Sequence, residues 1–269
     1  MLHALRFGDH GSPVVFCHGL FGQGRNWTQI GKSLAAEHRV TLLDLPDHGR
    51  SDWTPAEGGG WDYVAAADAV AAELDPDDPV ALVGHSMGGK VAMLVALRHP
   101  EVVARLCVVD VSPVAYQEAG EFPGYVEAMQ ALDLAALTTR ADADAGLRDA
   151  VPNDTVRAFL LQNLRRSDEA SEGWRWQMNL EGLGDSLDAL RGWPAESLTD
   201  TPPYDGPVLW IAGANADYVR AEYAEDMERL FPRVRKLTVK DAGHWVHSEQ
   251  PQVFEQVLQR FLESGSPTR

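Results

Sequence analysis

The sequence predicts an α/β fold in which a mostly parallel central sheet is flanked by helices and carries a helical insertion. Short apolar runs typical of buried strands alternate with helical periodicity in residues 14–109 and again in residues 208–262. Between them, residues 113–203 show no strand signal and are rich in alanine and leucine. We therefore expect a core formed by residues 1–112 and 204–269, with residues 113–203 inserted as a helical lid.

Composition and charge argue against some classes of binding partner. The 269 residues are 45% hydrophobic, which is enough for one sizeable core. The formal charge of −17 opposes binding to nucleic acid and to an anionic membrane surface, so neither is expected as a partner. The acidic excess indicates high solubility or, alternatively, a salt-rich habitat. The N-terminal residues lack a secretion-signal pattern and no apolar run reaches about 18 residues, so we expect a cytoplasmic protein.

The first part of the chain predicts three strands. Residues 2–7 alternate loosely in polarity and end at a glycine-containing turn. Residues 14–18 form a continuous apolar run, typical of a strand covered on both faces, and residues 40–45 predict the next strand. Cys17 in the second strand and Cys107 in a later one are expected to be small core side chains and not a redox pair.

Helices and further strands follow in alternation. Asn26 is a favourable N-cap for a helix beginning at Trp27, and apolar spacing predicts another helix over residues 62–74. The remaining strands and helices are expected over residues 105–109, 208–212, 221–230, 234–239 and 250–262.

Residues 80–99 combine an apolar strand, a serine between two glycines and a helical pattern. Gly84 and Gly88 lack the Cβ atoms that would collide where a strand and a helix pass closely, and Ser86 between them occupies a strained turn. The turn places the hydroxyl at a helix N-terminus, where unpaired N–H groups favour developing negative charge. The pattern predicts a nucleophilic serine; the alternative is an ordinary glycine-rich turn.

Partners for such a serine follow later strands. A serine hydroxyl is a poor nucleophile unless a base takes its proton, and a histidine held by a carboxylate is the usual base. His244 follows the last predicted strand in a glycine-containing loop, and His247 is its alternative. The acid is expected to be Asp110, which directly follows the strand after the helix that begins at the Ser86 turn. Asp217, in the loop after the next strand, is the alternative; Asp110 is preferred.

The oxyanion of an acyl-transfer intermediate needs N–H donors aimed at it. The amide of Met87 is expected to supply the first, and the amide of Leu20 or, alternatively, Phe21 the second. Aromatic side chains are expected to shape an apolar acyl pocket, although part of them would serve as lid core instead. The pocket candidates are Phe21, Trp174, Trp176 and Trp245.

At these motifs the sequence resembles the α/β-hydrolase family and, within it, the YbfF-type bacterial esterases. The resemblance rests on residues 18–22 with 26–27, 44–51, 84–90, 109–113 and 242–247, which span nearly the whole chain in the family's order. It implies a serine hydrolase acting on short acyl esters or thioesters, with Asp110 as the acid. The start of the chain departs from the family's pattern: the fold commonly has two strands before the oxyanion loop, and 13 residues hardly hold both, so we expect a shortened sheet edge.

The residues and the resemblance together predict a serine hydrolase that cleaves short-chain carboxylic esters through an acyl-enzyme formed on Ser86 and assisted by His244 and Asp110. No metal and no organic cofactor is expected. The alternatives are a thioesterase, an alcohol acyltransferase or a carbon–carbon bond hydrolase with the same three residues, and a non-catalytic ligand-binding module. Dehalogenase and epoxide hydrolase chemistry is disfavoured because those relatives carry a carboxylate where Ser86 stands.

Overall fold

The computed structural model describes residues 1–55, 60–118, 120–167 and 173–264 of the chain. In these residues a seven-stranded sheet has the order β1-β3-β2-β4-β5-β8-β9. Only β1 pairs antiparallel with its neighbour β3, so the prediction of a mostly parallel sheet is confirmed. The strands are β1 (Ala4–Phe7), β2 (Ser12–Cys17), β3 (His38–Leu43), β4 (Val80–His85), β5 (Val103–Val109), β8 (Val208–Gly213) and β9 (Val234–Val239).

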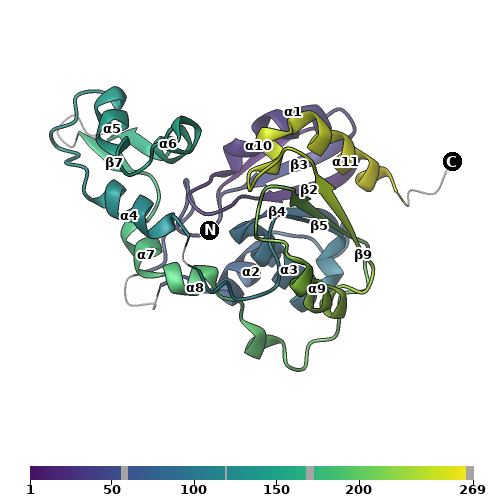
Figure 1. Ribbon diagram of the computed structural model, residues 1–269. Coiled ribbons are helices and arrows are strands. Elements are labelled where there is room, and N and C mark those ends of the chain that lie inside the picture. The colour runs from purple at the N-terminus through teal and green to yellow at the C-terminus, as the bar shows by residue number, and fades with distance from the viewer. Residues whose placement is uncertain (56–59, 119, 168–172, 265–269) are drawn as a thin grey trace.

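Helices cover both faces of this sheet (Figure 1). One face packs against α2 (Tyr63–Ala71), α3 (Met87–Arg98) and α9 (Ala224–Leu230), and the other against α1 (Thr28–Leu34), α10 (Val246–Glu249) and α11 (Pro251–Glu263). Successive strand residues point to opposite faces, so β2 sends Val15 and Cys17 into one hydrophobic cluster and Val14 and Phe16 into the other. Cys17 and Cys107 are both free and buried, as expected.

The start of α1 differs from the prediction. A short 3-10 helix, η1 (Gly24–Trp27), precedes α1, which begins at Thr28. Asn26 lies inside η1, where its side chain accepts a hydrogen bond from the backbone N–H of Gln23 at 2.6 Å and completes a capping box. The prediction that Asn26 caps α1 was therefore wrong, because the chain makes a tighter turn first.

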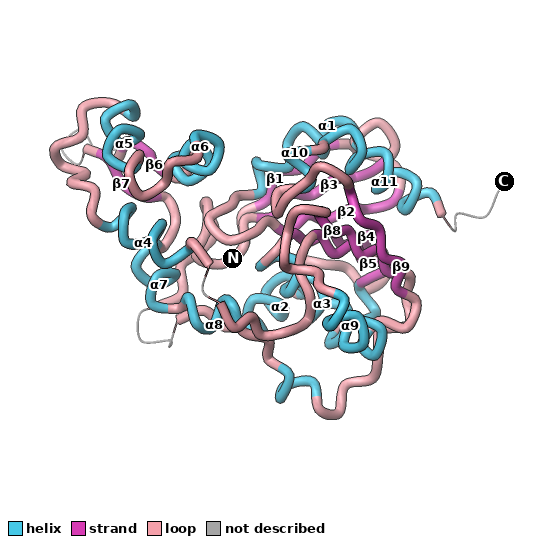
Figure 2. Tube along the Cα trace, viewed as in Figure 1, coloured by secondary structure: helices cyan, strands magenta, loops and turns pink. Residues whose placement is uncertain are grey.

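Residues 113–203, here called the cap segment, connect β5 to β8, and the helices α4 to α8 of this segment lie at one side of the sheet (Figure 1). The expectation that this segment contains no strand was wrong: β6 and β7 form an antiparallel pair in which Leu164 lies opposite Trp176 (Figure 2). Strands of three residues are too short to show a sequence period. The cap elements are α4 (Phe122–Gln130), α5 (Arg140–Leu147), α6 (Asp154–Leu161), β6 (Leu164–Arg166), β7 (Trp174–Trp176), α7 (Leu180–Asp185), α8 (Leu187–Arg191) and η4 (Ala195–Leu198).

Two short 3-10 helices, η3 (Pro100–Val102) and η5 (Ala221–Tyr223), complete the described elements. No helix in the described ranges has both the length and the apolar character needed to cross a bilayer.

In the turn between β4 and α3 the backbones of strand and helix pass very close to each other. A Cβ atom on Gly84 would lie 2.2 Å from the carbonyl oxygen of Gly88, and one on Gly88 would lie 2.3 Å from that of His18. Ser86 in this turn has φ 53° and ψ −122°, a conformation that L-residues rarely adopt. Helix α3 then buries eleven of its twelve residues, which holds the strained turn against the sheet.

We expect Gly84→Ala to lower the free energy of unfolding by about 2–3 kcal/mol, because its Cβ would overlap backbone atoms that cannot rotate away. Gly124→Ala is the matched control. Gly124 lies exposed on α4 with nothing within 4 Å of its added Cβ, so this change should be neutral or stabilise the protein by up to about 1 kcal/mol. Urea unfolding of the three proteins measures both effects, and equal stability of the two variants would contradict the packing argument.

Candidate active site

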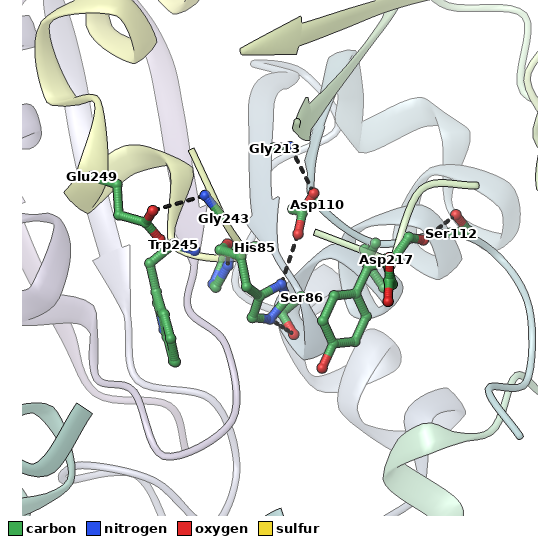
Figure 3. Close-up of polar contacts among 12 residues, drawn as sticks. His85, Ser86, Asp110, Ser112, Gly213, Asp217, Gly243, Trp245 and Glu249 are labelled. Atoms are coloured by element: carbon green, nitrogen blue, oxygen red, sulfur yellow. Dashed lines mark hydrogen bonds and ion pairs between the residues drawn. The ribbon is translucent and has the colours of Figure 1, made fainter. Parts of the chain in front are cut away.

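Three side chains from distant parts of the chain meet beyond the carboxyl ends of the parallel strands. Ser86 follows β4, Asp110 follows β5, and His244 lies in the loop after β9. The Nε2 atom of His244 lies 2.9 Å from the Ser86 hydroxyl oxygen, and its Nδ1 atom lies 2.8 Å from Oδ2 of Asp110 (Figure 3). Because parallel strands end at one edge of a sheet, elements separated by up to 158 residues converge here.

Hydrogen-bonding partners determine which nitrogen of His244 carries the proton. An ionised carboxylate only accepts, so the Nδ1–H donates to Asp110, and Nε2 is left to accept the Ser86 hydroxyl proton. The carboxylate of Asp110 is fully buried, and its other oxygen accepts the backbone N–H of Gly213 at 2.8 Å (Figure 3). Both oxygens are thus engaged, which prevents rotation of the carboxylate.

Two neighbours hold His244 from opposite sides. The Tyr218 ring stacks on the imidazole with centroids 4.0 Å apart. The Tyr218 carbonyl accepts hydrogen bonds from the Ser112 hydroxyl at 2.6 Å and the Tyr116 hydroxyl at 2.8 Å, which ties its backbone to the loop after β5. From the other side, Nε2–H of His85 donates to the His244 carbonyl at 2.8 Å. Ring and backbone of His244 are therefore both oriented by the protein.

The alternative candidates occupy other environments. Asp217 is exposed, and its backbone carbonyl accepts a hydrogen bond from Arg220, whereas Nδ1 of His244 is bonded to Asp110. The His247 ring stacks on Trp27 at 4.2 Å, and its surroundings lower its pKa to about 3, chiefly by desolvation. The geometry therefore brings together Ser86, His244 and Asp110 and leaves Asp217 and His247 outside this chain of hydrogen bonds.

Two backbone amides beside Ser86 are free to donate. Met87 is the first residue of α3, so its N–H has no partner within the helix, and in the described part of the chain the N–H of Leu20 has no acceptor either. The N–H of Phe21, in contrast, donates to Nε2 of His48 at 3.1 Å. Leu20 and Met87 are therefore the available donors, and Phe21 is occupied.

Buried neutral histidines hold the loop that carries Leu20. His48 donates its Nδ1–H to the carbonyl of Pro46 at 2.8 Å while its Nε2 accepts from Phe21, and desolvation lowers its pKa to about 3. His18 bridges in the same way, donating to the Gly19 carbonyl and accepting the N–H of Leu45 at 3.0 Å. Protonation would remove the accepting nitrogen, so both rings stabilise the loop only in their neutral form.

The cap segment contacts the same loop. Buried Asn163 donates from Nδ2 to the Phe21 carbonyl at 2.7 Å, and its Oδ1 accepts from the Gln23 side chain. This contact stabilises Phe21 at φ 60°. Tyr218, His48 and Asn163 were not assigned site roles from the sequence. Asn163 lies 142 residues from its partner Phe21, a distance at which no local pattern carries a signal.

Ser86 lines two cavities, and Leu20 and Phe122 also border both. The first is narrow, with a volume of about 30 Å³, and is lined by His244, Trp245 and Phe21. The second has a volume of about 200 Å³ and is lined by Met87, Tyr116, Tyr218 and Lys90.

Trp174 and Trp176 line neither of the cavities that contain Ser86. Trp176 is buried in the hydrophobic core of the cap segment, and the Trp174 ring lies 4.9 Å from the guanidinium of Arg166. Both belong to β7, which pairs with β6 inside the cap. Of the four pocket candidates, only Phe21 and Trp245 lie at the site.

Comparison with known proteins agrees with this architecture. A family model described as alpha/beta hydrolase fold matches residues 12–251. The chain is 36% identical over 264 residues to the sn-1-specific diacylglycerol lipase ABHD11 of Mus musculus, covering 95% of this chain and 82% of that protein. It is 30% identical over 253 residues to esterase YbfF of Escherichia coli strain K12, covering 93% of each. A solved structure described as a marine microorganism esterase superimposes with a TM-score of 0.89 at 28% identity, covering 97% of this chain and 98% of that one.

We expect the buried histidines to make the protein acid-sensitive. A histidine with a folded-state pKa of about 3 binds its proton more readily when unfolded, so stability falls as the pH drops from about 6.5 towards 3. His48 alone should lower the free energy of unfolding by about 2 kcal/mol between pH 7 and pH 5. His48→Gln preserves a donor and an acceptor without a titrating group and should flatten the dependence by that amount in urea unfolding at the two pH values. His10→Gln, at an exposed site, is the control and should hardly change how the free energy of unfolding depends on pH. The same pH dependence in the wild type and both variants would contradict the role of neutral His48.

Proposed function

The chain belongs to the α/β-hydrolase fold family and is a carboxylic ester hydrolase, and we propose that it cleaves short-chain esters through an acyl-enzyme intermediate on Ser86. The resemblance to the YbfF-type esterases is confirmed. The observation that carries the proposal is the hydrogen-bonded chain from Ser86 through His244 to Asp110, next to two unpaired amides. The mechanism requires neither a metal nor an organic cofactor.

In the acylation step, His244 accepts the Ser86 proton on Nε2 as the hydroxyl oxygen attacks the ester carbonyl carbon. The carbonyl oxygen becomes an oxyanion, which the N–H groups of Leu20 and Met87 bind while the α3 N-terminus favours its charge. The imidazolium is stabilised by the Asp110 carboxylate. It then donates the proton to the leaving alkoxide oxygen, so that the alcohol departs and the acyl group remains on Ser86.

Deacylation repeats the sequence with water. His244 takes a proton from a water molecule as the water oxygen attacks the acyl carbon, and the same two amides bind the second oxyanion. Collapse of this intermediate breaks the bond to Ser86, whose oxygen regains the proton from His244. The products are one carboxylic acid and one alcohol, and the three side chains return to their starting protonation.

The position of His244 indicates which part of the substrate each cavity holds. The general acid must reach the leaving oxygen, and His244 lines the first cavity and not the second. The alcohol therefore leaves through the first cavity, and the second cavity holds the acyl group. The cap segment contributes Phe122, Tyr125 and Phe159 to the first wall and Tyr116 and Leu187 to the second, which supports its role as a lid over residues 113–203.

A thioesterase with the same residues is the second candidate. Thioesters in cells are commonly carried on phosphorylated groups, which require cationic contacts. The groove that continues from the first cavity is lined by Asp154, Glu249 and Glu255, and the described residues that line it include no lysine or arginine. This surface opposes a phosphorylated leaving group and favours a neutral alcohol.

Ser86→Ala should lower turnover of a short-chain p-nitrophenyl ester by at least about 10³-fold, because the attacking oxygen is removed while the fold is retained. Initial rates with an acyl-chain series of esters, and of thioesters in parallel, measure the effect. Circular dichroism checks the fold. Undiminished turnover in the variant would remove the enzyme assignment.

Asp110→Asn should lower kcat by about 10²- to 10⁴-fold, because the amide no longer stabilises the imidazolium and can select the wrong tautomer. Asp217→Asn is the matched control and should leave kcat close to the wild-type value, because its carboxylate is exposed. A larger loss in Asp217→Asn than in Asp110→Asn would identify Asp217 as the acid.

A further inference from the structure

We propose that Lys90 determines substrate specificity by binding a carboxylate at the far end of the acyl group, so that monoesters of short dicarboxylic acids are preferred substrates. The inference rests on the proposed function, because it assigns a ligand to the acyl side of the same site. None of the chemistry described above uses Lys90.

Lys90 lies on α3 four residues after Ser86, and residues four apart share one face of a helix. Its side chain is 1% exposed and lines the acyl cavity together with Ser86. A lysine is almost never buried to this extent without a partner of opposite charge. Its position at the cavity is therefore a feature that needs a chemical explanation.

Two of the three ammonium N–H donors are used by the protein. The Nζ atom donates to the carbonyls of Arg191 at 2.9 Å and Gly192 at 2.5 Å, and it lies 4.7 Å from the centroid of the Tyr116 ring. In the part of the chain that the structure describes, no carboxylate forms an ion pair with Lys90, and no oxygen or nitrogen atom accepts its third N–H. Besides the two carbonyls, the ammonium contacts the faces of Tyr116 and, at 5.6 Å from the ring centroid, Tyr63. A carboxylate entering the cavity would supply both the missing acceptor and the missing charge.

The other charged residues of this cavity do not neutralise Lys90. Asp188, with a side chain 90% exposed, pairs with Arg191 at 2.8 Å, and Glu118 is exposed. Burial lowers the pKa of Lys90 to about 7, and no carboxylate contributes to that shift. A bound carboxylate would favour the charged ammonium, so ligand binding and proton binding at Lys90 support each other.

The carbonyl contacts also give Lys90 a structural role, because they join α3 to the C-terminal end of α8 in the cap segment. Loss of that role would impair every substrate alike. Carboxylate recognition, in contrast, changes the preference between substrates. The ratio of two specificity constants separates these roles.

The experiment compares two ethyl esters of nearly equal shape. Ethyl hydrogen glutarate carries a terminal carboxylate, and ethyl 5-methylhexanoate carries an isopropyl group in its place. The proteins are the wild type, Lys90→Met, Lys90→Arg and, as a matched control at an exposed site, Lys240→Met. Hydrolysis is followed by chromatography of the released acid, and each protein is described by the ratio of kcat/KM for the charged ester to that for the neutral ester.

We expect Lys90→Met to lower this ratio by about 10- to 100-fold, the range of a hydrogen bond between charged groups. Lys90→Arg should retain more of the ratio than Lys90→Met, and Lys240→Met should have the wild-type ratio. An unchanged ratio in Lys90→Met overturns the proposal, even if its absolute activity falls. Malonate, succinate and adipate monoesters extend the series to find the chain length at which the ratio is largest.

Binding supplies a second readout that does not need turnover. Calorimetric titration of glutarate into Ser86→Ala should give a dissociation constant about 10-fold or more lower than titration into Ser86→Ala/Lys90→Met. Equal affinities would contradict the role of Lys90. Failure of the wild type to hydrolyse either ester counts against the proposed function, whereas hydrolysis of the neutral ester with an unchanged ratio counts against Lys90 alone.

Discussion

The close passage of β4 and α3 is the constraint on which the rest of the site depends. Their backbones approach so nearly that neither Gly84 nor Gly88 could carry a side chain, and the turn between them forces Ser86 to a positive φ. The strain is retained because α3 is buried along almost its whole length. One contact thereby directs the hydroxyl towards His244, places it at a helix N-terminus and leaves the Met87 amide unpaired.

Buried polar groups orient the side chains and the loop around Ser86. Asp110 has both oxygens engaged, the His244 ring is stacked by Tyr218, and the loop of Leu20 is held by His18 and His48 in their neutral forms. Each of these groups is hydrogen-bonded, and leaving any of them without a partner would cost free energy in a low-dielectric interior. The same burial that gives the site its geometry makes it dependent on the protonation state of its histidines.

The cap segment contacts the candidate site through hydrogen bonds as well as through apolar side chains. Asn163 donates a hydrogen bond to the Phe21 carbonyl in the loop after β2. Lys90 on α3 donates hydrogen bonds to the carbonyls of Arg191 and Gly192 at the C-terminal end of α8. Phe21 lines the first cavity and Lys90 the second, so the two contacts reach different cavities. A change in the position of the cap would thus reach both the amides proposed to bind the oxyanion and the cavity proposed to hold the acyl group.

Local periodicity was enough to predict the alternation of strands and helices in the core and the turn at Ser86. Side chains placed at strand ends were enough to identify Ser86, Asp110 and His244 as candidates. The sequence by itself did not determine the short pair of strands in the cap, the 3-10 turn before α1, or the absence of Trp174 and Trp176 from the cavities, since three-residue strands carry no period and the facing of an inserted segment is decided by packing. The folded structure was needed to show that the Leu20 amide is free while the Phe21 amide is not, and that His48, Asn163 and Tyr218 lie at the site. These contacts join residues 26 to 142 positions apart, and the packing of whole elements decides such pairings, not any local pattern.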